Sequence, residues 1–192
     1  PTAPLEWRRH CQRERYIAHV RQLLDHIQRG DIYEVNYCTT RSTTAHAFDP
    51  FTAFSTLLQR TAAPFAGFFR QGPVFALCAS PERFLAFDGP RVMGQPMKGT
   101  RPRYADELRD QQAAQELAAD AKERSENIMA LDVMRHDLSR IAASRSVTME
   151  ELCAVRSYPR VHQMISTVSA IMRDGVAPPD VLRATFPMAS MT

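Results

Sequence analysis

The feature that most constrains the fold is a series of short apolar segments between residues 65 and 96. Gly72-Pro73 and Asp88-Gly89-Pro90 interrupt the series, and both sequences are typical of turns. This spacing predicts an antiparallel meander whose strands cover 65–70, 74–79, 82–87 and 91–96. Such short connections leave no room for helices between these strands.

Helical patterns flank this region on both sides. The periodicity of apolar residues and the capping residues predict helices over 9–29, 49–59, 105–143 (two helices breaking near Ala121) and from 178 onward. A strand is expected over 32–40, and at least one more within 147–168. Strands and helices do not alternate regularly, so the pattern favours an α+β fold, with one domain over residues 1–192.

Composition excludes several classes of protein. Of 192 residues, 44% are hydrophobic and 23% charged, which is typical of a globular domain and not of a disordered or collagen-like chain. No apolar run approaches the roughly 18 residues of a membrane span, and the first residues do not resemble a signal peptide. The four cysteines are too scattered for a disulfide framework or a zinc site, which favours a reducing cytoplasm. Because no initiator Met is present, we expect a processed or excised piece.

The charged residues suggest where chemistry could occur. The 24 basic and 21 acidic side chains are spread along the chain, so nucleic-acid binding is not expected. Of the basic residues, only Lys98 and Lys122 are lysines. Unlike arginine, lysine can act as a neutral amine nucleophile, although two lysines could equally be remnants of a composition bias.

One of these lysines has a predicted carboxylate neighbour. If residues 87 and 91 flank the turn, antiparallel partners have numbers that sum to about 178–180, so Glu82 lies opposite residues 96–98. The pair Glu82 and Lys98 could combine an acid with an amine nucleophile. The alternative is an ordinary cross-strand ion pair on the sheet surface.

Two further features allow a functional and a structural interpretation. Glu123 and Glu126 are three residues apart on a predicted helix, so both carboxylates could face one Mg²⁺ ion. They could also simply be solvated and favourable to the helix dipole. His162 lies in a polar strand-like segment, where a lone histidine is more often structural than catalytic.

Five ordered motifs resemble the chorismate-utilising enzymes. They are GDIYEVN (30–36), SPERFL (80–85), PMKGTRPR (96–103), ENIM (126–129) running into DVMRHDLSRI (132–141), and FPMASMT (186–192). That family includes anthranilate synthase component I, aminodeoxychorismate synthase component I, and isochorismate and salicylate synthases. The resemblance implies part of a large α/β sandwich of two packed antiparallel sheets.

The residue at position 98 separates members of this family. Where this chain has Lys98, anthranilate and isochorismate enzymes usually carry Ala. A lysine at this position resembles aminodeoxychorismate synthase component I. The resemblance therefore implies amination of chorismate to 4-amino-4-deoxychorismate, for p-aminobenzoate and folate synthesis. The partner would be a glutamine amidotransferase that supplies ammonia. The alternatives are an anthranilate or isochorismate synthase-type enzyme, or a non-catalytic truncated fragment.

The resemblance also implies roles for individual residues. Lys98 would be the nucleophile, Glu82 the acid, and His162 a histidine near the reacting face of the ring. Substrate would contact Gly99, Thr100 and Thr192. In the same way, Mg²⁺ would be held directly by Glu126 and through water by Glu123.

The chain departs from the family pattern at three places. Met188 and Ala189 replace two glycines, and Glu34 stands where many members have Gln. The family's second Mg²⁺-binding glutamate and the residues that hold substrate carboxylates would follow Thr192, and its N-terminal subdomain is largely missing. We therefore expect an incomplete catalytic domain.

Overall fold

The computed structural model describes residues 6–45 and 47–191, which form two compact units. The first unit comprises Pro1–Ala53 with Met191–Thr192, and the second comprises Phe54–Ser190. Every residue assigned a site role by the sequence lies in the second unit, except Thr192. That threonine lies outside the described residues.

The first unit contains the predicted first helix but not the predicted strand that follows it. α1 covers Arg13–Gln28, and β1 (Arg8–Arg9) pairs antiparallel with β2 (Arg41–Ser42). The prediction of a strand over 32–40 was wrong, because only residues 41–42 join a ladder. β-Branched and aromatic residues favour a strand only where a partner strand accepts their backbone hydrogen bonds.

The next two elements match their predicted turn and cap signals. α2 covers Pro50–Thr61, and the Asp49 carboxylate accepts from the backbone N–H groups of Phe51 and Thr52 at 3.2 and 3.0 Å. β3 (Phe65–Gln71) and β4 (Val74–Ser80) form a hairpin that turns at Gly72 (φ +57°). Among the described residues this hairpin is a separate two-stranded sheet, so the predicted continuous meander was wrong at this point.

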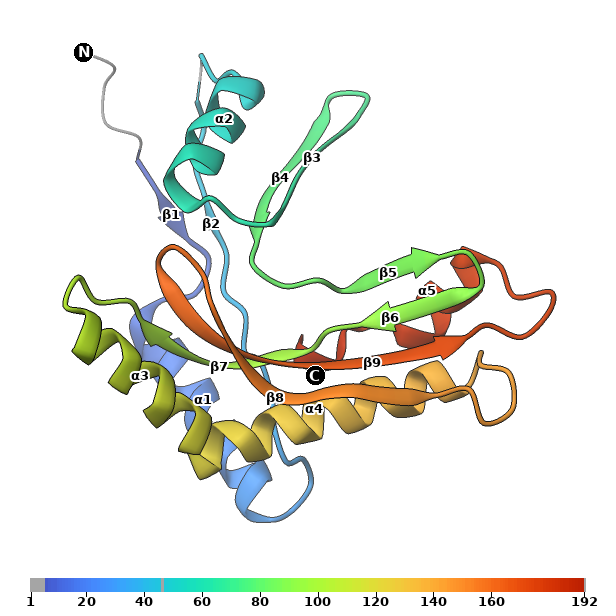
Figure 1. Cartoon of the computed structure of the whole chain (residues 1–192). Coiled ribbons are helices and arrows are strands. Elements are labelled where there is room, and N and C mark those ends of the chain that lie inside the picture. The colour runs from blue at the N-terminus through green and yellow to red at the C-terminus, as the bar shows by residue number, and fades with distance from the viewer. Residues whose placement is uncertain (1–5, 46, 192) are drawn as a thin grey trace. The chain divides into compact units, whose positions relative to one another are not determined.

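The main sheet is built around one long central strand. It contains β5 (Leu85–Asp88), β6 (Arg91–Gly94), β7 (Met97–Pro102), β8 (Thr148–Ser157) and β9 (Val161–Ile171), all antiparallel. β8 pairs with one edge of β9, while β6 and β7 follow one another along its other edge. β6 keeps its predicted hairpin partner β5 on one edge, while the distant segment β9 pairs with its other edge and with β7 (Figure 1).

Helices α3 (Glu107–Ala119) and α4 (Ala121–Ser139) cover one face of this sheet (Figure 1). The predicted break between them is confirmed: the Asp120 carboxylate accepts from the N–H groups of Lys122 and Glu123 and so begins α4. The buried core packs α4 against the sheet and against α5 (Pro178–Thr185), which precedes a short 3₁₀ turn, η1 (Ala189–Met191). A Cβ at Gly94 would lie 2.8 Å from the Met134 side chain, so only glycine allows this close approach.

Candidate functional site

The Glu82 side chain takes the place of a missing strand partner. The β5–β6 register sums to 179, as in Leu85↔Gly94, which aligns residue 82 with residue 97. The ladder stops at Leu85, however, and the Glu82 carboxylate accepts the Met97 N–H at 3.1 Å. The Ser190 hydroxyl donates to the other carboxylate oxygen at 3.0 Å. The predicted juxtaposition of position 82 with the segment around Lys98 is therefore present, although a side chain makes the contact.

The surroundings of Glu82 favour its protonated form. The side chain lines a cavity of about 440 Å³ whose other walls are largely apolar, including Phe65, Phe84 and Leu182. Burial raises the pKa of Glu82, and the hydrogen bonds from Ser190 and Met97 and the charge of Lys98 only partly oppose this. A carboxyl group with a raised pKa is suited to donate a proton.

Gly99 allows the strand carrying Lys98 to approach helix α4 closely. It has φ +90°, and a Cβ there would lie 3.1 Å from the Glu123 Cβ and 3.2 Å from a Glu123 carboxylate oxygen. The register of β7 with β9 is irregular between Met97 and Thr100, which accommodates this corner. Any other side chain at position 99 would displace the Glu123 carboxylate.

Glu123 and Glu126 lie in the first two turns of α4, on one side of the helix. The Glu123 side chain is only 18% exposed, so it is not a solvated helix-end residue, and one of its oxygens lies 3.8 Å from Arg101 Nη1. Glu126 forms an ion pair with Lys122 at 2.9 Å. No group of three potential metal ligands occurs within residues 6–45 and 47–191. Glu123 beside the Gly99 corner, with Glu126 one turn further along α4, nevertheless fits Mg²⁺, which commonly uses one or two carboxylates with waters and substrate oxygens.

His162 lies in a buried network on the helix-covered side of the sheet. Its Nε2 is 3.0 Å from the Asp110 carboxylate in α3, and its Nδ1 is 2.8 Å from the Ser157 hydroxyl. Hydrogen bonds from the Arg103 guanidinium and the Tyr104 N–H hold the pKa of Asp110 well below its usual range. The ionised carboxylate can only accept, so Nε2 donates to Asp110, while Nδ1 is held by its hydrogen bond with the Ser157 hydroxyl. Both ring nitrogens are therefore engaged within the protein.

Three residues near this site were not identified from the sequence. Asp110 anchors His162, and the fully buried Asn127 donates to the carbonyl of Met164 at 3.1 Å and to that of Lys98 at 3.5 Å. Gln163 is 8% exposed and lies beside Thr100 in the sheet. The sequence signal for Asn127 is its place in the ENIM motif, and no signal singled out Gln163 within its polar strand-like segment.

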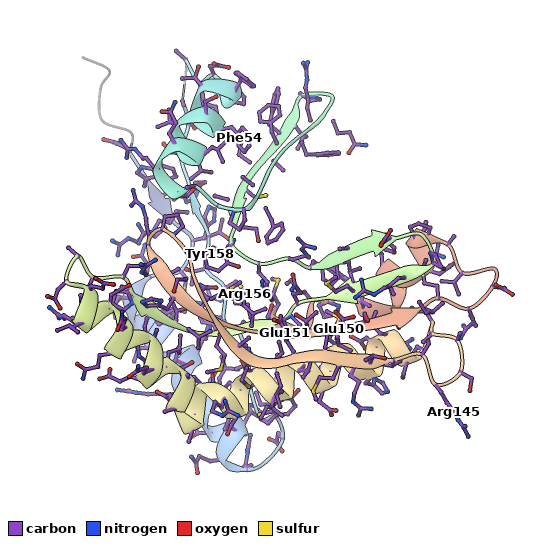
Figure 2. The ribbon with its side chains drawn as sticks, viewed as in Figure 1. Phe54, Arg145, Glu150, Glu151, Arg156 and Tyr158 are labelled. Atoms are coloured by element: carbon purple, nitrogen blue, oxygen red, sulfur yellow. The ribbon has the colours of Figure 1, made fainter. Side chains whose placement is uncertain are left out.

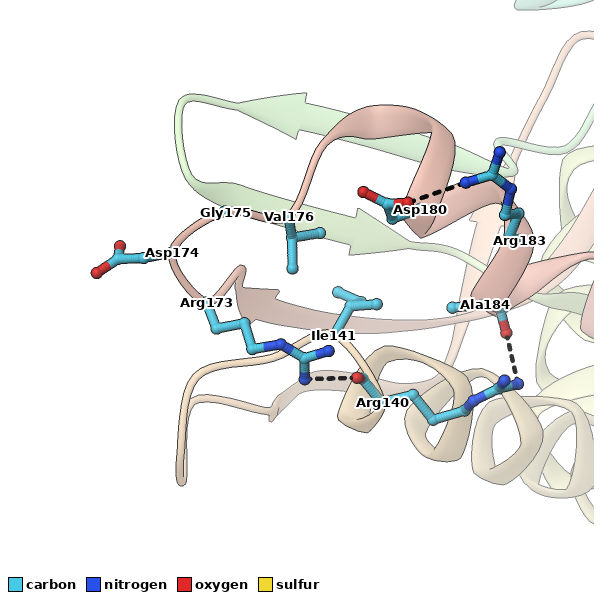
Figure 3. A pocket seen from close by; sticks show the side chains of 9 residues that line it. All are labelled: Arg140, Ile141, Arg173, Asp174, Gly175, Val176, Asp180, Arg183 and Ala184. Atoms are coloured by element: carbon cyan, nitrogen blue, oxygen red, sulfur yellow. Dashed lines mark hydrogen bonds and ion pairs between the residues drawn. The ribbon is translucent and has the colours of Figure 1, made fainter.

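A second cavity lies at the other end of α4, where Arg140, Arg173 and Arg183 line a space of about 410 Å³ (Figure 3). Arg140 and Arg173 donate to backbone carbonyls at 3.4 and 2.7 Å, and Arg183 pairs with Asp180 at 3.1 Å. Arg140 is fourteen helical positions beyond Glu126, or roughly 20 Å along the axis. This cavity is therefore separate from the Glu82–Lys98 corner.

Comparison with curated proteins gives relatives along the whole chain. Aminodeoxychorismate synthase component 1 of Escherichia coli is 38% identical over 193 residues, which cover 100% of this chain and 42% of that protein. Anthranilate synthase component 1 of Thermus thermophilus is 38% identical over 180 residues, covering 94% of this chain and 39% of that protein. The chain thus spans about two fifths of the length of these relatives.

Solved structures confirm the predicted fold. Anthranilate synthase component I from Streptococcus pneumoniae superimposes with a TM-score of 0.87 at 23% identity, over 99% of this chain and 41% of that one. The menaquinone-specific isochorismate synthase of Escherichia coli gives a TM-score of 0.65 at 14% identity, over 100% of this chain and 45% of that one. No helix in the described ranges is long and apolar enough to cross a membrane. The profile of chorismate-binding enzymes matches residues 1–192, and the chain therefore belongs to that family.

Proposed function

We propose that this chain is part of an aminodeoxychorismate synthase component I, which converts chorismate and ammonia to 4-amino-4-deoxychorismate. The observation that carries the proposal is the corner where Lys98 lies within electrostatic reach of Glu82, a carboxyl whose pKa is raised. Sequence similarity to aminodeoxychorismate synthase component 1 supports it. The product would serve p-aminobenzoate and folate synthesis.

In the first step, Lys98 is the nucleophile. Its neutral amine forms a C–N bond at ring C2, the two conjugated ring double bonds both shift by one position, and the C4–O bond breaks. Glu82 donates its proton to the departing hydroxyl, which leaves as water, while Glu82 becomes a carboxylate and the attached Lys98 nitrogen becomes a cation. The apolar cavity beside Glu82 favours the acid form that this step requires.

In the second step, ammonia forms a bond to C4, both ring double bonds shift back, and the C2–N bond to Lys98 breaks. The positive charge moves from the Lys98 nitrogen to the new amino group, and Lys98 returns to its neutral amine. A proton taken up by Glu82 completes the cycle. Two allylic displacements thus replace one difficult substitution of a hydroxyl group.

Mg²⁺, when bound, would neutralise and orient the ring carboxylate of chorismate. Glu126 would hold it directly and Glu123 through water, which is consistent with the Glu123 carboxylate beside Gly99. Gly99 and Thr100 would line the ring, and we propose that Thr192 also contacts substrate. His162 would support the ring face from within its network with Asp110 and Ser157, and not as a base, because both of its nitrogens are engaged.

Ammonia would come from a separate glutamine amidotransferase. Relatives named aminodeoxychorismate synthase component 1 support this, because a first component implies a second. We propose a cytoplasmic location, in keeping with the four free cysteines.

A second candidate function is anthranilate synthesis, which the 38% identity to an anthranilate synthase component 1 favours. Product identification separates the two. The whole protein that contains this sequence is incubated with chorismate, Mg²⁺ and an ammonium salt, and the products are identified by mass spectrometry. We expect 4-amino-4-deoxychorismate. Anthranilate or isochorismate as the main product would overturn the proposal.

We also expect that residues 1–192 alone do not turn over substrate. Mg²⁺ and chorismate binding by the 192-residue chain, measured by calorimetric titration, should be weak. Losing positioning contacts can cost roughly 7 kcal/mol of barrier lowering, which is enough to hide activity. Steady turnover with micromolar chorismate binding would show that the active site is misplaced.

A further inference from the structure

The short ladder between β1 and β2 places two arginines directly opposite one another, Arg9 and Arg41. Next to this pair, the His10 N–H donates to the Thr40 carbonyl at 3.0 Å, so positions 10 and 40 form a hydrogen-bonded pair. Hydrogen-bonded and non-hydrogen-bonded pairs alternate along antiparallel strands, and side chains lie closer together in the second kind. Arg9 and Arg41 therefore form a non-hydrogen-bonded pair, with both side chains on the same face of the ladder.

The charges of these two arginines are not balanced by a contacting carboxylate. Neither guanidinium forms an ion pair or a hydrogen bond within residues 6–45 and 47–191. On the main sheet, by contrast, Arg156 forms an ion pair with Glu151 of the same strand, and Figure 2 labels both residues. Because like charges directly opposite one another destabilise a ladder, the Arg9–Arg41 pair would gain from a negative charge beside it.

Both arginines line a cavity of about 200 Å³, and every residue that lines this cavity belongs to the first unit. A third arginine, Arg13, lines it from the first turn of α1 and likewise has no ion pair or side-chain hydrogen bond in the described part of the chain. Thr39 and Thr40 also line the cavity, and none of its described lining residues is acidic. Three permanent positive charges therefore meet at one small cavity.

The size and charge of the cavity limit what it can bind. Pockets for whole drug-sized ligands commonly measure about 300–1,000 Å³, so this cavity suits a single small group. Guanidinium groups carry several N–H donors in a planar fork and no acceptor, which matches an anion with several oxygens. A carboxylate offers two oxygens and one charge. A phosphate group offers three or more oxygens and a charge of about −1.5 to −2 at pH 7, so it matches three arginines better.

We propose that Arg9, Arg13 and Arg41 form a binding site for a phosphate group, supplied by inorganic phosphate or by a small phosphate ester. The bound group places negative charge beside the Arg9–Arg41 pair and so stabilises the β1–β2 ladder. The inference goes beyond the proposed function and is independent of it, because none of these residues has a role in the reaction. Since the three side chains are exposed, we expect a dissociation constant of about 1 mM at physiological ionic strength.

Calorimetric titration of the whole protein with potassium phosphate tests the site, with potassium chloride added to keep the ionic strength constant. Arg41→Gln removes one charge and keeps a polar side chain, and we expect the affinity for phosphate to fall about 10-fold. In phosphate-free buffer, the Tm of this variant should be no lower than that of wild type, because the opposing charge is gone. Arg13→Gln lies outside the ladder and should weaken binding similarly, so it provides the same test if Arg41→Gln does not fold.

Arg8→Gln is the matched control. Arg8 precedes Arg9 in β1, does not line the cavity, and points to the other face, since successive residues of a strand alternate. Removing its charge should change the affinity for phosphate less than about 2-fold. Glycerol 3-phosphate distinguishes the two sources, because tighter binding than inorganic phosphate indicates an ester and weaker binding indicates the free ion. The inference is overturned if phosphate does not saturate by about 20 mM, if acetate binds as tightly as phosphate, or if Arg8→Gln loses as much affinity as Arg41→Gln.

Discussion

Two carboxylates at opposite ends of β7 accept similar backbone hydrogen bonds, but their pKa values are shifted in opposite directions. Glu82 accepts the Met97 N–H where the strand begins, and Asp110 accepts the Tyr104 N–H just after it ends. Burial raises the pKa of Glu82, while the Arg103 guanidinium holds that of Asp110 well below its usual range. The backbone hydrogen bond is common to both, so it does not decide the direction.

The difference lies in the neighbouring charge. Arg103 contacts both Asp110 oxygens at 2.9 Å. The Glu82 carboxylate instead accepts from the neutral Ser190 hydroxyl, much of its cavity wall is apolar, and the charge of Lys98 only partly opposes the effect of burial. A contacting guanidinium makes a permanent anion that can anchor His162. An apolar wall makes a carboxyl that can hold and release a proton. This difference supports an anchoring role for Asp110 and the proposed role of Glu82 as the acid.

The largest expected effect comes from removing the amine beside Glu82. Lys98→Ala in the whole protein should reduce aminodeoxychorismate formation by more than about 1000-fold, because the first displacement loses its nucleophile. The fold should persist, since many relatives carry alanine at this position according to the sequence resemblance. Intact-protein mass spectrometry of the wild type with chorismate and no ammonia should show an adduct that maps to Lys98.

The second lysine provides the control for this prediction. Lys122 is exposed and paired with Glu126, and Lys122→Arg keeps its charge but removes its amine. The adduct should form as before in this variant. An adduct on Lys122, or undiminished product from Lys98→Ala, would contradict the role of Lys98 as the nucleophile. Glu82 would then lack the displacement in which it is proposed to donate its proton.

The next largest effect should come from the anchoring carboxylate. Asp110→Asn leaves the Arg103 guanidinium without its anionic partner. It also leaves a single acceptor oxygen for the N–H groups of Arg103, Tyr104 and His162, so we expect the lowest Tm of the variants considered. The folded pKa of Asp110 is depressed, so its stabilisation is full above the unfolded value near 4 and is lost as pH falls below it.

Thermal unfolding of Asp110→Asn and wild type between pH 3 and 8 tests this. The difference in Tm should be constant above about pH 5 and should shrink below pH 4. Asp132→Asn is the matched control, because Asp132 pairs with Arg135 on an exposed helix surface and should contribute little. A Tm difference that does not change with pH would mean that Asp110 does not anchor the network as an anion.

The hydrogen bonds of Asn127, which connect α4 to the sheet, should contribute less to stability. Asn127→Leu removes the N–H donor to the Met164 carbonyl and the oxygen that accepts from the buried Ser166 hydroxyl, and we expect a loss of about 3 kcal/mol in the free energy of unfolding. Denaturant unfolding measures it, with exposed Ser125→Ala as a control expected to change by less than about 0.5 kcal/mol. A neutral Asn127→Leu would mean that packing alone fixes α4 against the strand that carries Lys98.

Local signals in the sequence predicted much of this arrangement. The hairpin sum of 178–180 placed Glu82 beside residue 97, and the polar break near Ala121 is the Asp120 cap. The predictions that failed concerned strands whose pairing depends on residues distant in the sequence. Residues 32–40 form no strand because no ladder forms beside them. The predicted meander divides between β4 and β5, and β5–β6 joins a sheet whose central strand is the distant β9.

The same limit applies to the candidate site. His162 was identified by resemblance, but which face of β9 it occupies depends on register, and a shift of one residue exchanges it with Gln163. Asp110 could not be found because its function depends on Arg103 and His162, which are far from one another in sequence. Sequence motifs therefore predicted which segments meet, while the direction of each side chain required the structure.

The smallest expected effect has the opposite sign to that of Asp110→Asn. The folded pKa of Glu82 is raised, so ionisation of Glu82 costs stability, and this cost develops as pH rises through its unfolded value near 4.5 toward the folded one. Glu82→Gln removes the ionisation and keeps an oxygen that can accept the Met97 N–H. We expect a slightly higher Tm than wild type at pH 7 and no difference below about pH 4. Exposed Glu116→Gln should show neither change. A lower Tm for Glu82→Gln at pH 7 would mean that Glu82 is stabilised as an anion, like Asp110, and would remove the basis for its role as the acid.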